Sequence, residues 1–384
     1  MWNASDIHRG DVLNDKPQTP EHRLEIDRST APGREPGPID LRRYYAHPAY
    51  SGIATFMGVP YCLNQEDLRA GNVDVAVLGI PLDASVGHRG ASYGPRMIRS
   101  DERYVFNTPE AMINASTRIN PFDVLKVVDY GDAAVDPFST ANSIGPIRAL
   151  VREIAEVGAV PVLLGGDHSL LWPSVGALAD VYGPEKIGVI HFDAHPDCHD
   201  TMLGHKVTHS TPIRRIIEDE KIPAGNVVQV GLRTVTGPDN QLFNWMRRQG
   251  MKSHFMAEIE QIGFHAVLDK AIAEVQENAE FVYLSLDIDV LDPAFAPGTG
   301  TPEPGGLTNR ELFPAFRRIC HETKVIGMDV VEVAPHLDAG YSTTMNARRA
   351  IFEGLTGLAM NRLKITGPNY LNPIVSGQVK FPMG

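Results

Sequence analysis

Apolar residues gather in short unbroken runs from residue 73 onward. The runs are rich in Val and Ile, and they comprise Val73–Ile80, Leu125–Asp129, Val160–Gly165, Ile187–Asp193, Val227–Leu232, Phe281–Asp289 and Val325–Val333, with a weaker eighth run near Ser253–Met256. Unbroken apolarity over a few residues is typical of strands buried on both faces, as in a parallel sheet. The pattern therefore predicts seven buried parallel strands and a weaker eighth one.

The segments between these runs have the spacing of helices. Ile144–Val157 and Ala266–Val275 carry apolar residues at helical intervals. Alternating strands and helices predict βαβ units and one α/β domain with helices on both faces of the sheet. We assign this single domain to residues 71–384.

Residues 1–70 differ in composition from the rest of the chain. They are polar and Pro-rich, and the run Ala31–Pro38 contains too many prolines and glycines for a helix or a central strand. We predict an extended N-terminal arm here. Whether the arm packs on a neighbouring subunit or on its own domain stays open at this point.

The composition argues against some classes of binding partner and favours one cellular compartment. The chain has 384 residues and a formal net charge of −12, which argues against nucleic acid or an anionic membrane as partner. Three cysteines suit a reducing compartment better than a disulfide framework. The N-terminus lacks the apolar region of a secretory signal, and no run approaches the roughly 20 apolar residues of a membrane span. A cytoplasmic location is expected.

Carboxylates and histidines follow three of the predicted strands. The third strand ends in Gly165-Gly-Asp-His-Ser169, the fourth in His191-Phe-Asp-Ala-His-Pro-Asp197, and the sixth in Ser285-Leu-Asp-Ile-Asp289. Ligands of parallel sheets bind beyond the carboxyl ends of the strands. Because alternate residues of a strand point the same way, we expect these side chains to converge on one small volume.

Such a cluster requires cations. The convergent side chains comprise four carboxylates and two imidazoles, namely His168, Asp193, His195, Asp197, Asp287 and Asp289. Like charges that close together repel strongly unless they are neutralised. Mixed carboxylate and imidazole ligation suits Mn, Ni, Fe, Co or Zn rather than Ca. The sequence therefore predicts a metal centre at this edge of the sheet.

These motifs, in this order, resemble the arginase/agmatinase (ureohydrolase) family over roughly residues 73–362. The resemblance also includes Asp129-Tyr-Gly-Asp132 and Asp329-Val-Val-Glu-Val-Ala-Pro335. It implies a three-layer α/β/α fold around an eight-stranded parallel sheet. It also implies assembly as a homo- or hetero-oligomer, commonly a trimer or hexamer.

The resemblance implies a site for two divalent ions, Ni²⁺ or Mn²⁺, in each chain. One ion would be bound by His168, Asp193, Asp197 and Asp287, and the other by Asp193, His195, Asp287 and Asp289. On this assignment, Asp193 and Asp287 bridge the two ions. The implied reaction is hydrolysis of a guanidino C–N bond, which releases urea and an amine.

Three further roles follow from the same resemblance. Asp197 would orient the attacking water, and Glu332 would pair with the guanidinium of a small cationic substrate. His209, in the segment Lys206–Ser210, would pass a proton to the leaving amine; a histidine suits this role because its unperturbed pKa is ~6.5. His88, in the glycine-rich loop after the first strand, is a further candidate for substrate binding. Cys198 is expected to be packed and not to act as a nucleophile.

The sequence departs from the agmatinase pattern near the substrate. Agmatinases often carry two arginines at the positions aligned here with His88 and Ser92. The N-terminal arm is also long for a bacterial agmatinase and resembles the branch that hydrolyses guanidine, alkylguanidines or biguanides such as metformin. A small guanidine or N-alkylguanidine is therefore the first substrate hypothesis. Agmatine, guanidinobutyrate or another ω-guanidino compound is the alternative.

Other classes were weighed against this interpretation. A formimino-hydrolase would use the same metals, and Arg89 offers a basic group for the carboxylate of such a substrate. A histone-deacetylase-like enzyme would use a single zinc ion and different motifs. A non-catalytic subunit is expected to lose metal ligands, whereas this chain keeps all six. An active subunit that needs an unlike partner stays open.

Overall fold

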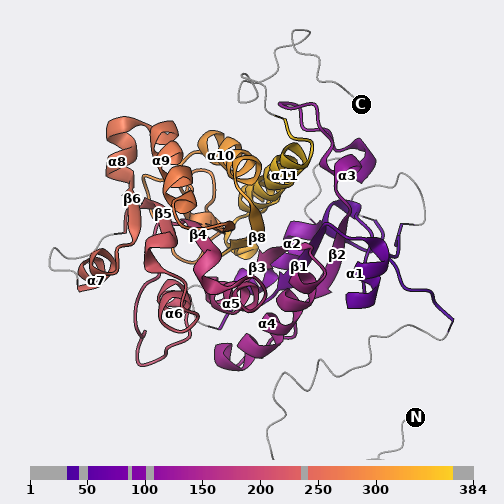
Figure 1. Ribbon diagram of the computed structural model, residues 1–384, viewed down its shortest axis with the longest axis horizontal. Helices are drawn as coiled ribbons and strands as arrows, with labels where there is room; N and C mark the ends of the chain where they lie inside the picture. The colour runs from indigo at the N-terminus through magenta and orange to yellow at the C-terminus, as the bar shows by residue number, and fades with distance from the viewer. Residues whose placement is uncertain (1–32, 43–50, 85–88, 101–107, 235–240, 366–384) are drawn as a thin grey trace, which may run out of the picture.

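The computed structural model describes residues 33–42, 51–84, 89–100, 108–234 and 241–365. An eight-stranded sheet forms the centre of the molecule, and every pairing between its strands is parallel (Figure 1). The strand order is β2-β1-β3-β8-β7-β4-β5-β6. The strands are β1 (Val75–Ile80), β2 (Val127–Asp132), β3 (Val160–Gly165), β4 (Ile187–Phe192), β5 (Val227–Leu232), β6 (Lys252–Phe255), β7 (Phe281–Asp287) and β8 (Val325–Val331). Each predicted run overlaps one of them, including the weaker run at edge strand β6; β2 extends three residues beyond its predicted run, Leu125–Asp129.

Helices cover both faces of the sheet, as predicted. The α-helices are α1 (Gln65–Gly71), α2 (Gly94–Ser100), α3 (Pro121–Val124), α4 (Thr140–Glu156), α5 (Leu171–Tyr182), α6 (Pro212–Glu218), α7 (Gln241–Gln249), α8 (Met256–Ile262), α9 (Phe264–Gln276), α10 (Asn309–Glu322) and α11 (Ser342–Arg362). One apolar core contains residues of α1 and α4 to α7, and a second contains residues of α2 and α8 to α11. The two cores lie on opposite faces of the sheet, so the fold has three layers, α/β/α (Figure 1).

Local sequence sets where the longer helices begin. Ser139 precedes α4, and its side chain accepts a hydrogen bond from the backbone N–H of Asn142. Thr308 and Glu311 form a capping box at the start of α10, in which each side chain bonds the other residue's backbone N–H. These caps satisfy N–H groups that have no partner within the helix. They fix the point at which the chain leaves each loop and turns back over the sheet.

The described part of the predicted arm contacts the domain. Arg34 donates to Asp67 at 2.7 Å, and the carboxylate of Asp67 is fully buried. Ile39 pairs with Tyr61, and Tyr61 pairs in turn with Asp129 of β2. Residues 65–71 form helix α1, so the last part of this segment is not extended. Residues 33–42 therefore pack against the domain of the same chain. The domain boundary at residue 70 stays a prediction.

None of the helices in the described part of the chain is both long and apolar enough to cross a membrane.

Candidate metal centre

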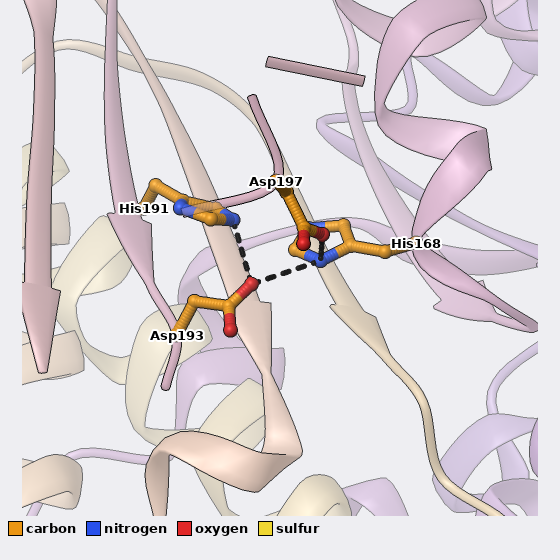
Figure 2. Close-up of side chains that lie close together, drawn as sticks. All are labelled: His168, His191, Asp193 and Asp197. Carbon is orange, nitrogen blue, oxygen red and sulfur yellow. Dashed lines mark ion pairs between the residues drawn. The ribbon is translucent and has the colours of Figure 1, made fainter. Parts of the chain in front are cut away.

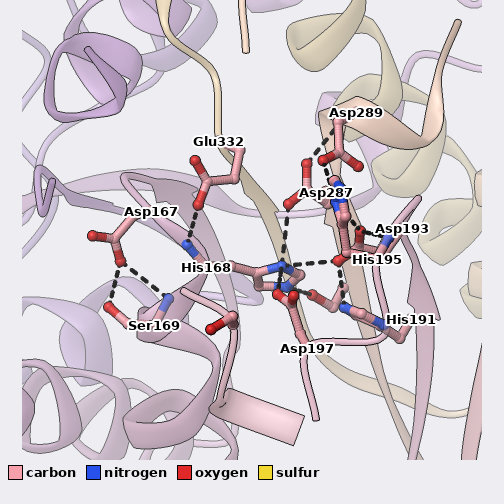
Figure 3. A network of polar contacts seen from close by, with 12 residues as sticks. Asp167, His168, Ser169, His191, Asp193, His195, Asp197, Asp287, Asp289 and Glu332 are labelled. Atoms are coloured by element: carbon pink, nitrogen blue, oxygen red, sulfur yellow. Dashed lines mark hydrogen bonds and ion pairs between the residues drawn. The ribbon is translucent and has the colours of Figure 1, made fainter. Parts of the chain in front are cut away.

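The strand order brings three distant parts of the sequence to one place. Strands β3, β8, β7 and β4 are neighbours in the middle of the sheet, although β3 and β8 are far apart in the chain. Their carboxyl ends lie at the same edge because all four are parallel. Asp287 is the last residue of β7, and the loops after β3, β4 and β7 carry the other five predicted metal ligands. The loop after β8 carries Glu332. Figure 3 shows these side chains pointing toward one another.

Five of the six side chains converge through turns beyond the strand ends and not through strand alternation. Strand β4 ends at Phe192, and Asp197 has a left-handed backbone with φ of 48°. Asp289 lies in the 3₁₀-helix η8 (Ile288–Val290), just beyond β7. The alternating geometry that we expected for these positions is therefore wrong. Turns of the backbone beyond β4 and β7 therefore bring Asp197 and Asp289 to Asp287 at the end of β7.

The loop after β3 fits closely under its neighbours. A Cβ atom on Gly166 would lie 2.4 Å from the carbonyl oxygen of Ile80 and 2.6 Å from that of Leu82, so only glycine is accommodated. The Gly166 carbonyl also accepts the backbone N–H of Glu332 at 2.9 Å. This close approach holds the following residue pair, Asp167 and His168, against the ends of β1 and β8.

The first group of ligand atoms surrounds the Nδ1 atom of His168. This nitrogen lies 3.2 Å from Oδ2 of Asp193, 3.1 Å from Oδ2 of Asp197 and 3.2 Å from Oδ2 of Asp287 (Figure 3). The side chain of His168 is fully buried, and the three carboxylates are nearly so. His191 reaches Asp193 from the other side, with Nε2 at 3.0 Å from the same Oδ2 (Figure 2).

The second group adjoins the first and shares Asp193. The Nδ1 atom of His195 lies 2.9 Å from Oδ2 of Asp289 and 3.5 Å from Oδ1 of Asp193. The Oδ1 atom of Asp287 accepts the backbone N–H of Asp289 at 2.9 Å, which ties the two aspartates together. The six side chains predicted as ligands therefore lie in two adjoining groups, with one oxygen of Asp193 directed to each.

The electrostatics of the cluster favour added positive charge. Burial by itself lowers the pKa of His168, but the surrounding carboxylates raise it well above its ordinary value. In the same way, Asp193 and Asp289 outweigh burial and raise the pKa of His195 to about 12. Burial, together with Asp289 and Asp193, raises the pKa of Asp287. Protons or divalent cations can supply the charge that these carboxylates attract.

The donor atoms fit divalent cations. Among the described residues, Nδ1 of His168 and Oδ2 of Asp193 are buried and have no hydrogen-bond partner, although they face each other. Buried polar atoms without partners are costly, and a cation bound between them would satisfy both. Carboxylate oxygens and imidazole nitrogens suit first-row transition metals such as manganese and nickel.

Glu332 lies beside the cluster, and only one of its two carboxylate oxygens has a hydrogen-bond partner among the described residues. Its backbone is left-handed, with φ of 59°, and its Oε1 accepts the backbone N–H of His168 at 2.8 Å. Its Oε2 is buried and has no hydrogen-bond partner among the described residues. Burial, and then the nearby Asp287 and Asp167, raise the pKa of this carboxyl well above its ordinary value. A cationic group that donates N–H bonds would satisfy Oε2 and keep the carboxylate ionised.

The remaining predicted residues lie farther from these contacts. His209 is half-buried and lines a cavity of about 750 Å³ formed by residues 138–141, residues 202–209 and Ala84. Ala84 donates its backbone N–H to Asp167, which places one wall of the cavity next to the loop that carries His168. His88 lies outside the described residues.

The side chains that support the cluster were not among the predicted site residues. Four buried residues, His191, Gln229, Ser285 and Asp329, contact the predicted ligands or one another. Ser285 and Asp329 stood in the quoted motifs, and His191 directly precedes the Phe-Asp-Ala-His run. Gln229 had no such signal, because a lone glutamine in an apolar strand carries no spacing that marks a function.

Comparison with known proteins agrees with this geometry. The family model described as the Arginase family matches residues 73–356. The chain belongs to the arginase family. The family resemblance inferred from the motifs is thus confirmed, together with the eight-stranded parallel α/β fold. The family assignment also makes the chain a hydrolase of C–N bonds in linear amidines.

Curated relatives and solved structures cover most of the chain. It is 38% identical over 311 residues to the guanidinobutyrase of Pseudomonas aeruginosa, covering 80% of this chain and 93% of that protein. It is 35% identical over 343 residues to the human mitochondrial guanidino acid hydrolase, covering 88% and 91%. The solved proclavaminate amidino hydrolase of Streptomyces clavuligerus superposes with a TM-score of 0.71 at 33% identity, covering 82% and 99%. Arginase-family members use a binuclear metal centre, and this chain has the His/Asp cluster for one.

Proposed function

We propose that this chain hydrolyses the C–N bond of a guanidino group and releases urea and an amine. The buried cluster, with the unpartnered Oε2 of Glu332 beside it, carries this proposal. His168, Asp193, Asp197 and Asp287 would bind one divalent ion, and Asp193, His195, Asp287 and Asp289 the other, either Ni²⁺ or Mn²⁺. When bound, two such ions lower the pKa of water and so supply a nucleophile near neutral pH.

Residues of the chain then orient the substrate and move protons. The Oε2 atom of Glu332 accepts N–H bonds from the planar guanidinium, a charge-assisted contact that holds its carbon toward the cluster. Asp197 accepts a hydrogen bond from the attacking water. His209, at the wall of the adjoining cavity, gives a proton to the leaving amine as the C–N bond breaks. Burial of the cluster excludes other water from the reacting carbon.

A small guanidine or N-alkylguanidine is the first candidate substrate. His88 and Ser92 stand where agmatinases often have arginines, so a long substrate tail has fewer partners in this loop. Guanidine, dimethylguanidine and a biguanide such as metformin all present the planar cation that Glu332 is placed to accept.

One observation favours a second candidate, an ω-guanidino acid. The cavity lined by His209 also has Lys206 and His205 in its wall, and none of its lining residues is acidic. A substrate carboxylate is attracted to such a wall, whereas the free amine of agmatine is repelled. Relatives named guanidinobutyrase and guanidinopropionase point to the same class, although others are named agmatinase.

Urea release measures these alternatives directly. Protein loaded with nickel or with manganese is assayed against guanidine, methylguanidine, dimethylguanidine, metformin, agmatine, guanidinobutyrate and arginine. Turnover of the small or alkylated compounds supports the first candidate. Turnover of guanidinobutyrate that falls in Lys206→Ala, while Lys221→Ala behaves as wild type, supports the second. Two bound ions with no urea from any compound would contradict the proposed reaction for the isolated chain.

Assembly and location belong to the same proposal. We expect a cytoplasmic homo- or hetero-oligomer, a trimer or hexamer. Light scattering of the purified chain gives its mass, and activity of the chain alone excludes the need for an unlike partner subunit.

A further inference from the structure

Two buried histidines compete for one carboxylate oxygen. The rings of His168 and His191 lie 4.8 Å apart, and both side chains are fully buried. Nδ1 of His168 is 3.2 Å from Oδ2 of Asp193, and Nε2 of His191 is 3.0 Å from the same atom (Figure 2). By distance alone, either ring can ligate an ion bound at Asp193. A neutral imidazole binds a metal only through the nitrogen without hydrogen, so the proton positions decide.

Gln229 determines the proton position of His191. Its Nε2 lies 2.9 Å from the carbonyl oxygen of Pro196 and 3.0 Å from Nδ1 of His191. The Pro196 carbonyl can only accept hydrogen bonds, so the amide must turn its NH₂ group to this side. The same NH₂ group then donates to Nδ1 of His191, which therefore carries no hydrogen. The hydrogen of His191 lies on Nε2, the nitrogen that faces Asp193.

Asp329 determines the opposite proton position in His168. The hydroxyl of Ser285 donates to Oδ1 of Asp329 at 2.8 Å, and Asp329 also accepts from the hydroxyl of Tyr283 at 2.7 Å. Ser285 has only one hydrogen, so its oxygen must accept from Nε2 of His168, which lies 3.0 Å away. In the neutral ring, which is the form that binds a metal, Nδ1 of His168 is then left without hydrogen, and it is the atom surrounded by the three carboxylates.

We propose that these two networks divide the roles of the histidines. His168 is a metal ligand through Nδ1. His191 is no ligand; it is a positioning residue whose Nε2, 3.0 Å from Oδ2 of Asp193, keeps that oxygen directed to the first group of ligand atoms. Gln229 sets the tautomer of His191, and Asp329, through Ser285, sets that of His168. The inference rests on the metal centre proposed above and adds the role of His191, which is not among its ligands.

Manganese binding separates a ligand from a positioning residue. The full chain is titrated with manganese(II) against a competing chelator, and bound ions per chain are counted in wild type, His168→Leu, His191→Leu and His191→Gln. We expect at most one ion in His168→Leu. His191→Leu should keep two ions at saturation with affinity weakened about 10- to 100-fold, the usual effect of losing a residue that orients a metal ligand. His191→Gln should recover most of this loss, since an amide can accept from Gln229 and donate to Asp193.

Substitution of Gln229 tests the tautomer separately from packing. Met and Glu both approximate the size of Gln, but Met has no hydrogen bond to offer Nδ1 of His191, and Glu would accept from it and reverse the tautomer. We expect manganese affinity to fall in the order wild type, Gln229→Met, Gln229→Glu, with folding checked by circular dichroism. If Gln229 contributed only to packing, Gln229→Glu would not bind manganese more weakly than Gln229→Met once both variants are folded.

The outcomes also separate this inference from the proposed function. Loss of one ion in both His191→Leu and His191→Gln, with wild type binding two, would make His191 a ligand and overturn the inference while leaving the metal centre intact. Failure of wild type to bind either manganese or nickel would overturn the metal centre and the inference together. Absence of urea from a chain that binds two ions would contradict the proposed reaction and leave the division of roles standing.

Discussion

Glu332 accepts the backbone N–H of His168 at 2.8 Å, although 164 residues separate the two in the chain. The bond joins the loop after β8 to the loop after β3, and these strands are neighbours in the sheet. It uses one oxygen of Glu332 and leaves Oε2 buried without a partner. The residue that positions a proposed metal ligand is therefore also the one placed to accept a cationic substrate.

Glu332→Gln should separate metal binding from substrate capture. The amide keeps an oxygen for His168 but turns an NH₂ group toward the guanidinium, so the charge-assisted bonds are lost. We expect kcat/KM to fall about 10- to 150-fold, corresponding to about 1.5–3 kcal/mol. Two ions per chain should remain by elemental analysis. Normal turnover of this variant would show that Glu332 serves the structure and not the substrate.

Asp193→Ala and Asp287→Ala should each abolish metal loading at both sites. Both carboxylates are proposed to be shared by the two ions, so removing either leaves each ion with an incomplete set of ligands. Asp269→Ala is a matched control, since this exposed carboxylate pairs with Arg318 away from the cluster. Ions per chain are counted after loading with manganese and gel filtration. Two ions retained in either cluster variant would rule out the bridging assignment.

His209→Ala should leave metal content unchanged and slow the reaction. The residue lines the cavity beside the cluster and has no place among the proposed ligands. A proton donor of this kind contributes typically about 10²- to 10⁴-fold to the rate. Turnover is measured for the best substrate of the panel, with His265→Ala, on helix α9, as the control. Unchanged kinetics in His209→Ala would remove His209 from the mechanism.

Divalent ions should stabilise the folded chain. The four carboxylates repel one another, and an ion that binds only the native state adds about 2.7 kcal/mol at a concentration of 100 Kd. The melting temperature should fall on treatment with a chelator and recover on addition of manganese. The same treatment should leave the melting temperature of Asp193→Ala unchanged. A wild-type protein that melts identically in both conditions would count against the metal centre.

The three cysteines should be inert and dispensable for catalysis. Burial raises the pKa of Cys62 to about 12, and burial with Asp197 and Asp193 raises that of Cys198 well above its ordinary value. A raised pKa keeps each thiol neutral, so labelling by iodoacetamide should be slow at pH 7 and should quicken as the pH rises. Cys198→Ala should retain turnover within a few-fold. A large loss, with two ions still bound, would implicate the thiol in the reaction.

The sequence by itself determined the strands and the residue types of the site. Unbroken runs such as Val160–Gly165 and Val227–Leu232 match β3 and β5 to the residue, because only strands buried on both faces need such apolarity. The order of the motifs was enough to identify the family. Several charged groups at the ends of three strands serve few purposes other than binding cations. Local spacing was enough for both inferences.

Only the tertiary structure decided how these residues meet. Strand order is set by packing across the whole sheet, and it placed β8 between β3 and β7, which brought Glu332 to His168. The left-handed turn at Asp197 replaced the strand alternation that the sequence suggested. The distinct surroundings of His168 and His191 likewise depend on Ser285 and Gln229, which come from different strands. The direction of a hydrogen bond depends on the donors and acceptors that folding brings together. The spacing of residues along the sequence does not determine it.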